Sequence, residues 1–190
     1  MKKLEVRVPH MLKKLRRGPS VMLPKDVGMI VAYTCIGKDS LVVDAGAGTG
    51  FNAIMLGRVA KKVVSYERRE EFAKLAEENV KSLGMKNVRI RHADIMDGIE
   101  EKDADLVTLD MPESEKVLPL AYKALKEGGY CVGYLPNVEQ AKEFCLGAQK
   151  LFREVFMLEN IVREYEVRDF GVRPKHVGLM HTAYLVFARK

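Results

Sequence analysis

Three glycines in one short turn, Gly46, Gly48 and Gly50, follow an apolar run that ends at Asp44. A glycine turn between a strand and a helix lets backbone N–H groups approach a nucleotide-like ligand. A dinucleotide fingerprint would place its third glycine where Phe51 stands, so the spacing disfavours that class of ligand. The carboxylate of Asp44 would repel a pyrophosphate and attract an ammonium group. The pattern therefore favours S-adenosylmethionine, which joins an amino-acid ammonium to a nucleoside and carries no phosphate.

Acidic residues also end or follow the next three apolar runs. Glu67 ends the run 62–67 and lies 21 residues after Gly46, the distance at which a βαβ unit delivers a carboxylate to a ribose. We expect Glu67 to accept both ribose hydroxyls, and Asp94, after the run 88–91, to lie beside the adenine amino group. Asp110 follows the fourth run. A single acid at a strand end is more often a helix cap, but the carboxyl ends of parallel strands meet at one edge of a sheet. Together these acids predict one site.

The spacing of apolar residues predicts alternating helices and strands. Helices are expected at about 24–36, 51–60, 69–83, 115–125 and 138–152, and strands at 62–67, 88–91, 104–110, 130–135, 155–167 and 181–188, besides the strand that ends at Asp44. Such alternation predicts an α/β, Rossmann-like fold with a mostly parallel seven-stranded sheet and helices on both faces. The last two strands are expected to pair as a hairpin and supply one antiparallel edge strand. This is the architecture of class I S-adenosylmethionine-dependent methyltransferases.

The composition is that of one globular domain. The chain has 190 residues, of which 47% are hydrophobic and 31% charged. The apolar runs are too short to span a bilayer and the N-terminus lacks the apolar core of a signal peptide, so we expect a cytoplasmic protein with no membrane contact. The three cysteines, Cys35, Cys131 and Cys145, have no C-x-x-C spacing, and no metal site or disulfide is predicted.

The net charge of +6 is concentrated at the N-terminus. Residues 1–17 form a basic arm ahead of the methyltransferase domain at 18–190, and its basic residues are Lys2, Lys3, Arg7, Lys13, Lys14, Arg16 and Arg17. The arm would attract a polyanion through counterion release. A solvated terminus is an equally good interpretation, because no aromatic residue is interleaved for base stacking.

Several short motifs are more distinctive than the glycine turn. They are Pro24-Lys25-Asp26, Ser65-Tyr66-Glu67, Leu109-Asp110-Met111-Pro112-Glu113, Tyr134-Leu135-Pro136-Asn137, and the segments 163–168, 173–174 and 181–185. With them the chain resembles, from about Gly18 to Lys190, the tRNA adenine-N1 methyltransferases that modify the TΨC loop, commonly called TrmI. The resemblance implies S-adenosylmethionine as methyl donor, tRNA as partner and a homotetramer.

Three features depart from that family. The basic arm stands where members usually carry a small β-rich N-terminal domain. Leu23 replaces a tyrosine often found before Pro-Lys-Asp, and Ser114-Glu115 replaces a Pro-Trp pair. Each aromatic stack on a base contributes roughly 1–3 kcal/mol, so the acceptor half of the site is altered while the cofactor half is intact.

The resemblance and the strand-end positions suggest roles for residues on the acceptor side. We expect Asp110 to be the catalytic residue, accepting a hydrogen bond from the exocyclic amine of adenine and stabilising positive charge as the methyl arrives. Its alternative role is to cap the turn before Pro112. Candidate substrate contacts are Pro112, Tyr134, Asn137, Arg173 and His176. The last two belong to a basic cluster that either grips phosphates or forms a salt-bridged face with Glu164 and Glu166.

Two other functions stay open at this point. The chain could methylate a small molecule or a protein carboxylate, or it could be a non-catalytic partner subunit that kept the fold. An enzyme that acts on RNA should bind tRNA with an affinity that falls as salt rises, whereas a small-molecule or protein methyltransferase should not bind it. An enzyme should bind S-adenosylmethionine, whereas a non-catalytic subunit should not.

Overall fold

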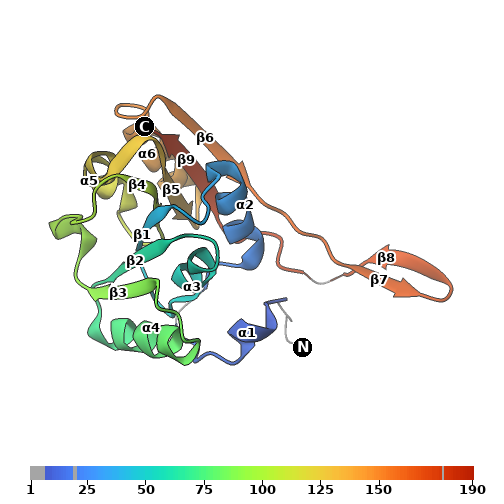
Figure 1. The fold of residues 1–190 in the computed structure, drawn as a ribbon. Helices are drawn as coiled ribbons and strands as arrows, with labels where there is room; N and C mark the ends of the chain where they lie inside the picture. Colours follow the sequence, from blue (N-terminus) through green and yellow to red (C-terminus); the bar gives the residue numbers. More distant parts are fainter. Residues whose placement is uncertain (1–6, 19–20, 177) are drawn as a thin grey trace.

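A seven-stranded sheet forms the centre of the molecule (Figure 1), with the strand order β3-β2-β1-β4-β5-β9-β6. The computed structural model describes residues 7–18, 21–176 and 178–190. The strands of the sheet are β1 (Leu41–Ala45), β2 (Lys62–Glu67), β3 (Val88–His92), β4 (Ala104–Leu109), β5 (Leu125–Leu135), β6 (Glu154–Glu159) and β9 (Tyr184–Arg189). Strand β9 is antiparallel to both neighbours, and the other pairs are parallel. The predicted fold class is confirmed, and the antiparallel strand lies one place inside the edge strand β6.

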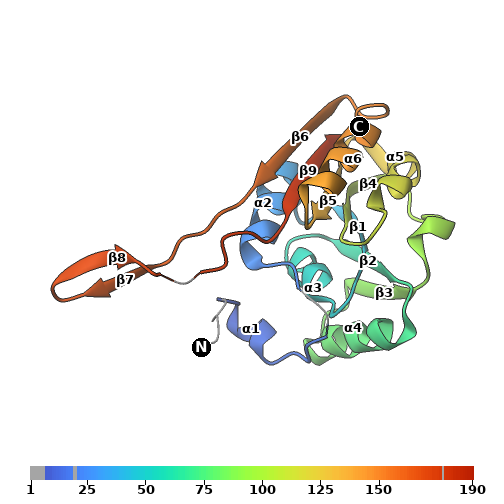
Figure 2. The same cartoon turned by 180° about the vertical axis from the view of Figure 1, so that it is seen from behind.

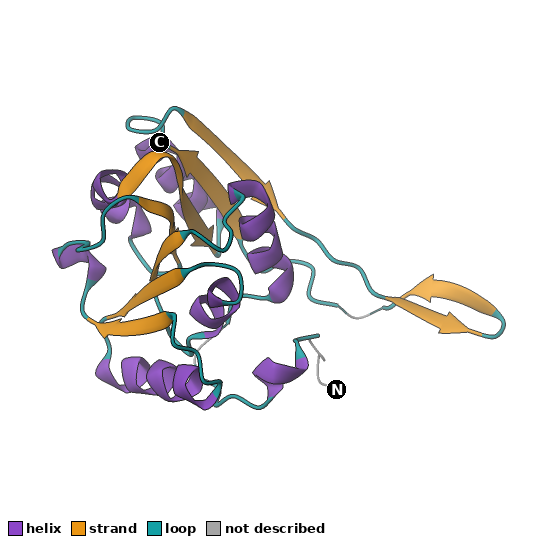
Figure 3. Cartoon of the chain, viewed as in Figure 1, coloured by secondary structure: helices purple, strands orange, loops and turns teal. Residues whose placement is uncertain are grey.

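Helices cover both faces of this sheet (Figure 3). They are α1 (His10–Lys13), α2 (Pro24–Thr34), α3 (Phe51–Gly57), α4 (Glu70–Ser82), α5 (Leu118–Ala124) and α6 (Val138–Ala148), with short 3₁₀ turns η1 (Ile95–Asp97) and η2 (Ser114–Val117). Successive strand residues point to opposite faces. Val42 therefore packs in a cluster with α1 to α4, and Val43 in a second cluster with α5 and α6.

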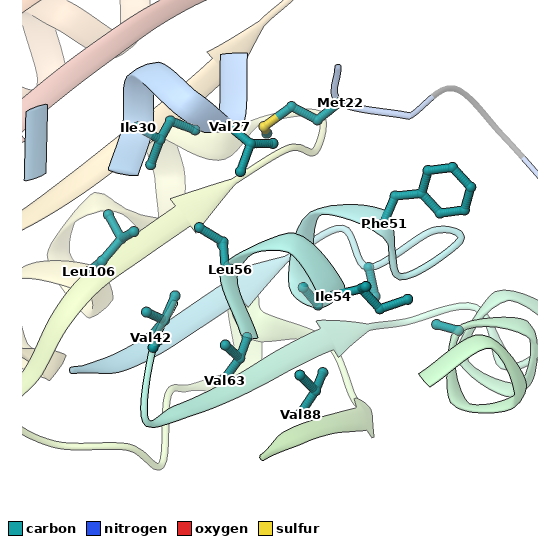
Figure 4. Close-up of a cluster of buried hydrophobic side chains, with 14 of the residues drawn as sticks. Met22, Val27, Ile30, Val42, Phe51, Ile54, Leu56, Val63, Val88 and Leu106 are labelled. Atoms are coloured by element: carbon teal, nitrogen blue, oxygen red, sulfur yellow. The ribbon is translucent and has the colours of Figure 1, made fainter. Parts of the chain in front are cut away.

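The first of these clusters fixes the strand that carries the glycine turn. Ile30 from α2, Val42 from β1 and Leu106 from β4 are fully buried together (Figure 4). Burying such a side chain stabilises the fold by roughly 1.5–3 kcal/mol. Tight packing on both sides of β1 leaves its carboxyl end little freedom to move, which suits a strand that must hold a binding turn.

The order of the strands reverses between β1 and β4. From β1 the chain proceeds outward through β2 and β3, and β4 then returns to the other side of β1. In open α/β sheets, ligands bind outside the carboxyl ends of the strands at such a switch point. The fold therefore places the ends of β1 and β4, with Asp44 and Asp110, at the expected binding position.

Local sequence signals account for some of the helix boundaries. Helix α2 begins at Pro24, whose fixed φ suits the first helical position, and ends at Thr34, after which Cys35 adopts the left-handed conformation. Helix α6 begins after Asn137, whose side chain accepts a hydrogen bond from the Gln140 N–H. The predicted helix at 115–125 is instead η2 followed by α5, and the other predicted helices end one to four residues too late.

The last part of the chain contains a feature that the sequence analysis missed. The predicted single strand 155–167 was wrong, because β6 ends at Glu159 and the chain then leaves the sheet. Strand β7 (Tyr165–Arg168) pairs with β8 (Gly171–Pro174) in a separate two-stranded ribbon that projects from the domain (Figure 2). Residues 160–164 have strand-like propensity, but propensity does not show whether an extended segment has a neighbouring strand.

Part of the basic arm packs on the domain. Residues 1–6 of the arm lie outside the described residues, whereas Leu12 and Leu15 are buried against α2 to α4. Asn79 holds the next part of the chain, since its side chain bonds the backbone of Arg16 in both directions. The same side chain donates to the carbonyl of Thr49, so α4 ties the arm to the glycine turn. Within the described part of the chain, no helix is long and apolar enough to cross a membrane.

Candidate active site

One pocket at the carboxyl ends of β1 to β4 gathers five of the predicted site residues. They are Gly46, Glu67, Asp94, Asp110 and Pro112. Arg68, Arg69 and Met111 also line it and were not anticipated from the sequence. Arg68 directly follows Glu67 and is followed by Arg69, and Met111 directly follows Asp110, so their positions follow from the ends of β2 and β4. Groups of three His, Cys, Asp or Glu side chains able to hold a metal are absent from the described residues.

The glycine turn forms a close backbone cradle at this pocket. Gly46, Gly48 and Gly50 all have positive φ values, of 88°, 52° and 79°, which side chains rarely adopt. A Cβ atom on Gly46 would overlap the backbone carbonyl of Asp110. The N–H groups of Gly46 and Ala47 both bond the Tyr66 carbonyl, at 3.0 and 3.1 Å. The turn is thus held between β2 and β4 in a conformation that only glycine accommodates.

Glu67 connects this turn to the pocket wall. Its side chain is buried, and Oε2 accepts a hydrogen bond of 2.9 Å from the Gly48 N–H. Oε1 accepts from the N–H and Nε of Arg69, at 3.1 and 3.2 Å. A carboxylate offers about four acceptor positions, so three are already occupied. A ribose with two hydroxyls would have to displace the half-exposed Arg69 side chain from Glu67.

Asp44 lies beneath the turn and does not line the pocket. Its buried carboxylate accepts hydrogen bonds from Asn52 Nδ2 at 2.8 Å, Ser65 Oγ at 2.5 Å and Thr108 Oγ1 at 2.6 Å. Burial raises the pKa of Asp44 although these three donors act in the opposite direction. The geometry lets Asp44 influence a bound ammonium by its charge through the glycine turn rather than by direct contact.

Asp94 both caps η1 and lines the pocket. Its Oδ1 accepts from the Met96 N–H at 2.9 Å and thereby caps η1. The residue also lines the pocket beside Ala93 and Ile95. The predicted role beside adenine stays a prediction, and the cap shows how the acid is held in place.

Asp110 lines the pocket, and no cationic side chain among the described residues forms an ion pair with it. Burial, and then the negative charge of Asp44, raise its pKa to about 7. Hydrogen bonds make no contribution to this shift. Asp110 does not cap η2, because Glu113 occupies the N-cap position of that turn and no side chain caps it. At neutral pH its carboxyl group is therefore poised between the two protonation states, and the residue lines the pocket.

The remaining predicted substrate residues lie on β5, at the start of α6 and on the ribbon. Leu109 pairs with Gly133, which places Tyr134 next to Asp110 across β4 and β5. Burial, followed by the charge of Asp26, raises the pKa of Tyr134 above its usual range, and Asp110 adds to this effect. Asn137 is exposed and caps α6. Arg173 and His176 do not reach the pocket, since Arg173 belongs to the projecting ribbon and bonds His176 at 2.8 Å.

Ion pairs occupy much of the predicted basic cluster on the ribbon. Glu166 pairs with Arg168 and Arg173, and Glu164 pairs with Lys175 and Arg7. The salt-bridged alternative from the sequence analysis therefore describes this face. Such exposed pairs contribute little to stability, and a polyanion could exchange with the carboxylates.

Comparisons with known proteins agree with this geometry. The family model described as "tRNA methyltransferase complex GCD14 subunit" matches residues 13–179. A Methanocaldococcus jannaschii protein, tRNA (adenine(57)-N(1)/adenine(58)-N(1))-methyltransferase TrmI, is 34% identical over 94% of this chain and 74% of its own length. The crystal structure of tRNA (m1A58) methyltransferase TrmI from Aquifex aeolicus superposes with a TM-score of 0.88 at 29% identity, covering 94% of this chain and 73% of that one.

A Thermotoga maritima crystal structure is also similar. It is described as an S-adenosylmethionine-dependent O-methyltransferase and superposes with a TM-score of 0.87 at 34% identity. The match covers 91% of this chain and 67% of that one. Relatives of this fold are thus described with both nitrogen and oxygen as methyl acceptors.

Proposed function

The chain belongs to the tRNA methyltransferase family of the GCD14 subunit, and we propose that it transfers a methyl group from S-adenosylmethionine to N1 of an adenine in tRNA. The observation that carries this proposal is the position of Asp110. It lies in the pocket wall against the glycine turn, with no ion-pair partner among the described residues, where an acceptor base would meet a methyl donor.

The pocket residues fit S-adenosylmethionine. Gly46 lines the pocket and carries no side chain, so a ligand can approach the backbone there. Glu67 and Asp94 would hold the nucleoside part, and Asp44 would favour the ammonium through its charge. The cofactor supplies an electrophilic methyl group on a sulfonium sulfur. Among the described residues that line the pocket, the cationic ones are Arg68 and Arg69, and both are exposed.

For methyl transfer to N1 of adenine, the main task of the protein is to position the two reactants. N1 of adenine carries a free lone pair at neutral pH, so the enzyme need not remove a proton before methyl transfer. The lone pair forms the new N–C bond as the S–C bond breaks, and positive charge develops on the base. Holding the two reactants in line is worth up to roughly 7–11 kcal/mol in ideal cases. The Asp110 carboxylate would accept a hydrogen bond from the exocyclic amine, orient the base and stabilise that charge.

The acceptor class is tested by letting acceptors compete for the methyl group. The protein is incubated with radiolabelled S-adenosylmethionine and either total tRNA or a mixture of proteins rich in damaged aspartyl residues. The proposal expects label in tRNA only. Label in protein carboxylates would instead support the O-methyltransferase description of the Thermotoga maritima relative, and failure to bind the cofactor at all would indicate a non-catalytic subunit.

We also propose that the enzyme works as a homo-oligomer, a tetramer by its family resemblance, and acts on tRNA in the cytoplasm. The ribbon supports self-association because one of its faces is apolar: Tyr165, Val167 and Val172 share it, with Phe170 in the turn. Val167 is 76% exposed and Phe170 is 85% exposed. An isolated two-stranded hairpin is marginally stable in water, so a cover from a second copy would stabilise it.

A further inference from the structure

A partly buried polar cluster lies where the projecting ribbon joins the domain. At its centre the Lys25 ammonium donates to Asp26 Oδ1 at 2.6 Å, to the carbonyl of Asn160 at 2.6 Å and to Thr182 Oγ1 at 2.7 Å. The Asn160 amide returns a hydrogen bond of 2.8 Å to the Lys25 carbonyl. The first turn of α2 is thus bonded to two segments that are distant in the sequence.

Those two segments are the roots of the ribbon. Asn160 directly follows β6, and Thr182 precedes β9 by two residues, so the chain leaves and re-enters the sheet at these points (Figure 1). Lys25 therefore holds the outgoing and the returning strand of the ribbon at once. A second link lies beside it, where His181 bonds Glu159 at 2.6 Å and the Pro136 carbonyl at 2.9 Å.

The same cluster reaches the acceptor side of the candidate site. Asp26 is fully buried, and its Oδ2 accepts a 2.9 Å hydrogen bond from Thr182 Oγ1. The Tyr134 hydroxyl lies 3.5 Å from that same oxygen. Tyr134 in turn lies next to Asp110 across β4 and β5. A short chain of contacts thus runs from the ribbon root through Asp26 to the residue beside the proposed catalytic acid.

We propose that Asp26 and Thr182 are positioning residues that couple the ribbon to the methyl-acceptor site by setting the place and orientation of the Tyr134 hydroxyl. This inference rests on the proposed function and on the substrate contact predicted for Tyr134 from the sequence. With its proton directed toward Asp26, the hydroxyl presents an oxygen lone pair to a base on which positive charge develops. A partner seated on the ribbon would shift its roots and, through Thr182 and Asp26, the acceptor side.

A purely structural role explains the cluster less well. A buried Lys–Asp pair costs desolvation free energy that a packed apolar pair would not. Such a pair stabilises little unless every oxygen and proton finds a partner, and here the partners come from both ribbon roots and from Tyr134. The cluster therefore specifies where these segments lie relative to one another, which is what coupling requires.

The test uses Thr182, because its substitution is milder than that of buried Asp26. Thr182→Val removes the hydroxyl that accepts from Lys25 and donates to Asp26 Oδ2, and Thr182→Ser keeps it as the matched control. Both are made in the wild-type chain and in Tyr134→Phe. Steady-state kinetics with tRNA are measured together with the ¹³C resonance of Cζ-labelled tyrosine, in which the Tyr134 signal is identified by its loss from Tyr134→Phe.

The proposal expects Thr182→Val to lower kcat about five- to tenfold, as for one lost hydrogen bond, with KM for S-adenosylmethionine unchanged within about twofold. Thr182→Ser should resemble wild type. In the Tyr134→Phe background the effect of Thr182→Val should fall below about twofold, because the two residues act through one contact. Equal effects in both backgrounds would overturn the proposal.

The resonance experiment needs no methyl acceptor and so separates this inference from the proposed function. Thr182→Val, and Asp26→Asn where it folds, should shift the Tyr134 Cζ signal, and Thr182→Ser should not. An unshifted signal in Thr182→Val would refute the coupling whatever the enzyme methylates. A shifted signal without tRNA methylation would leave the coupling supported and the proposed acceptor wrong.

Discussion

The backbone carbonyl of Asp110 occupies the space that a Cβ atom on Gly46 would need. The Asp110 N–H also donates to the Ala45 carbonyl at 2.9 Å, so the ends of β1 and β4 stay paired up to the pocket. The turn proposed to hold the methyl donor and the acid proposed to orient the acceptor are therefore parts of one rigid contact. A change in either backbone must disturb the other.

Gly46→Ala should damage both stability and cofactor binding. The new methyl group meets the Asp110 carbonyl, and φ at this position is +88°. We expect a loss of about 2–4 kcal/mol in the free energy of unfolding and a large loss of S-adenosylmethionine affinity. Urea unfolding and calorimetry measure the two effects. Gly28→Ala is the matched control, because its Cβ would meet nothing within 4 Å. A Gly46→Ala variant with wild-type affinity would show that the turn is not the binding cradle.

We expect Asp44 to contribute mainly to folding stability and Glu67 mainly to cofactor binding. Asp44→Ala leaves the buried donors of Ser65, Thr108 and Asn52 without their acceptor, and should lower stability by about 2–4 kcal/mol. Glu67→Gln keeps an acceptor for Gly48 and removes the charge, so stability should change by less than about 1 kcal/mol while cofactor affinity falls about tenfold or more. Calorimetry on both variants checks this. Equal loss of stability in the two would contradict the division.

Much of this site follows from the sequence, and the exceptions share a cause. The glycine spacing and the strand-end acids predict the pocket because parallel strands bring their carboxyl ends to one edge. The role of Asp26 was missed because Thr182, its partner, lies 156 residues away and no local pattern connects them. Asp44 was expected to meet the ligand, but its three protein donors come from α3, β2 and β4 and are visible only after folding.

Asp110 should make both activity and stability depend on pH near neutrality. Its pKa in the folded protein is raised from 3.8 to about 7 by burial and by Asp44. Because the carboxylate is the form that accepts a hydrogen bond, kcat/KM should rise with pH around 7, and Asp110→Asn should abolish the rise and lower turnover about 10²–10³-fold. A pH profile that keeps its inflection in Asp110→Asn would exclude this acid from the mechanism.

The raised pKa of Asp110 also makes the free energy of unfolding depend on pH. A carboxyl group with a raised folded pKa contributes stability that is complete below pH 3.8 and is lost as pH rises through about 7. Asp110→Asn should therefore be more stable than wild type at pH 8 by about 2–4 kcal/mol, and the difference should shrink towards pH 4. Urea unfolding at the two pH values measures it. A constant difference would show that Asp110 titrates normally in the folded state.

The ribbon should hold copies of the chain together without supporting the domain. Replacing Phe170 and Val167 by serine removes exposed apolar groups that contact no core cluster. Sedimentation velocity should show a shift to smaller species, while the unfolding free energy of the domain at fixed concentration changes little apart from the lost association. Leu146→Ser, an exposed apolar residue on α6, is the control and should leave the assembly intact. An unchanged sedimentation coefficient would mean that the ribbon has another occupant.

The most direct measurement follows the methyl group to a single nucleoside. The protein is incubated with S-adenosylmethionine that carries a trideuterated methyl group and with unmodified tRNA, and the digested RNA is analysed by mass spectrometry. The account predicts trideuterated 1-methyladenosine with wild type and about 10²–10³-fold slower formation with Asp110→Asn. Label in any other nucleoside, or no label in RNA from a protein that binds the cofactor, would contradict it.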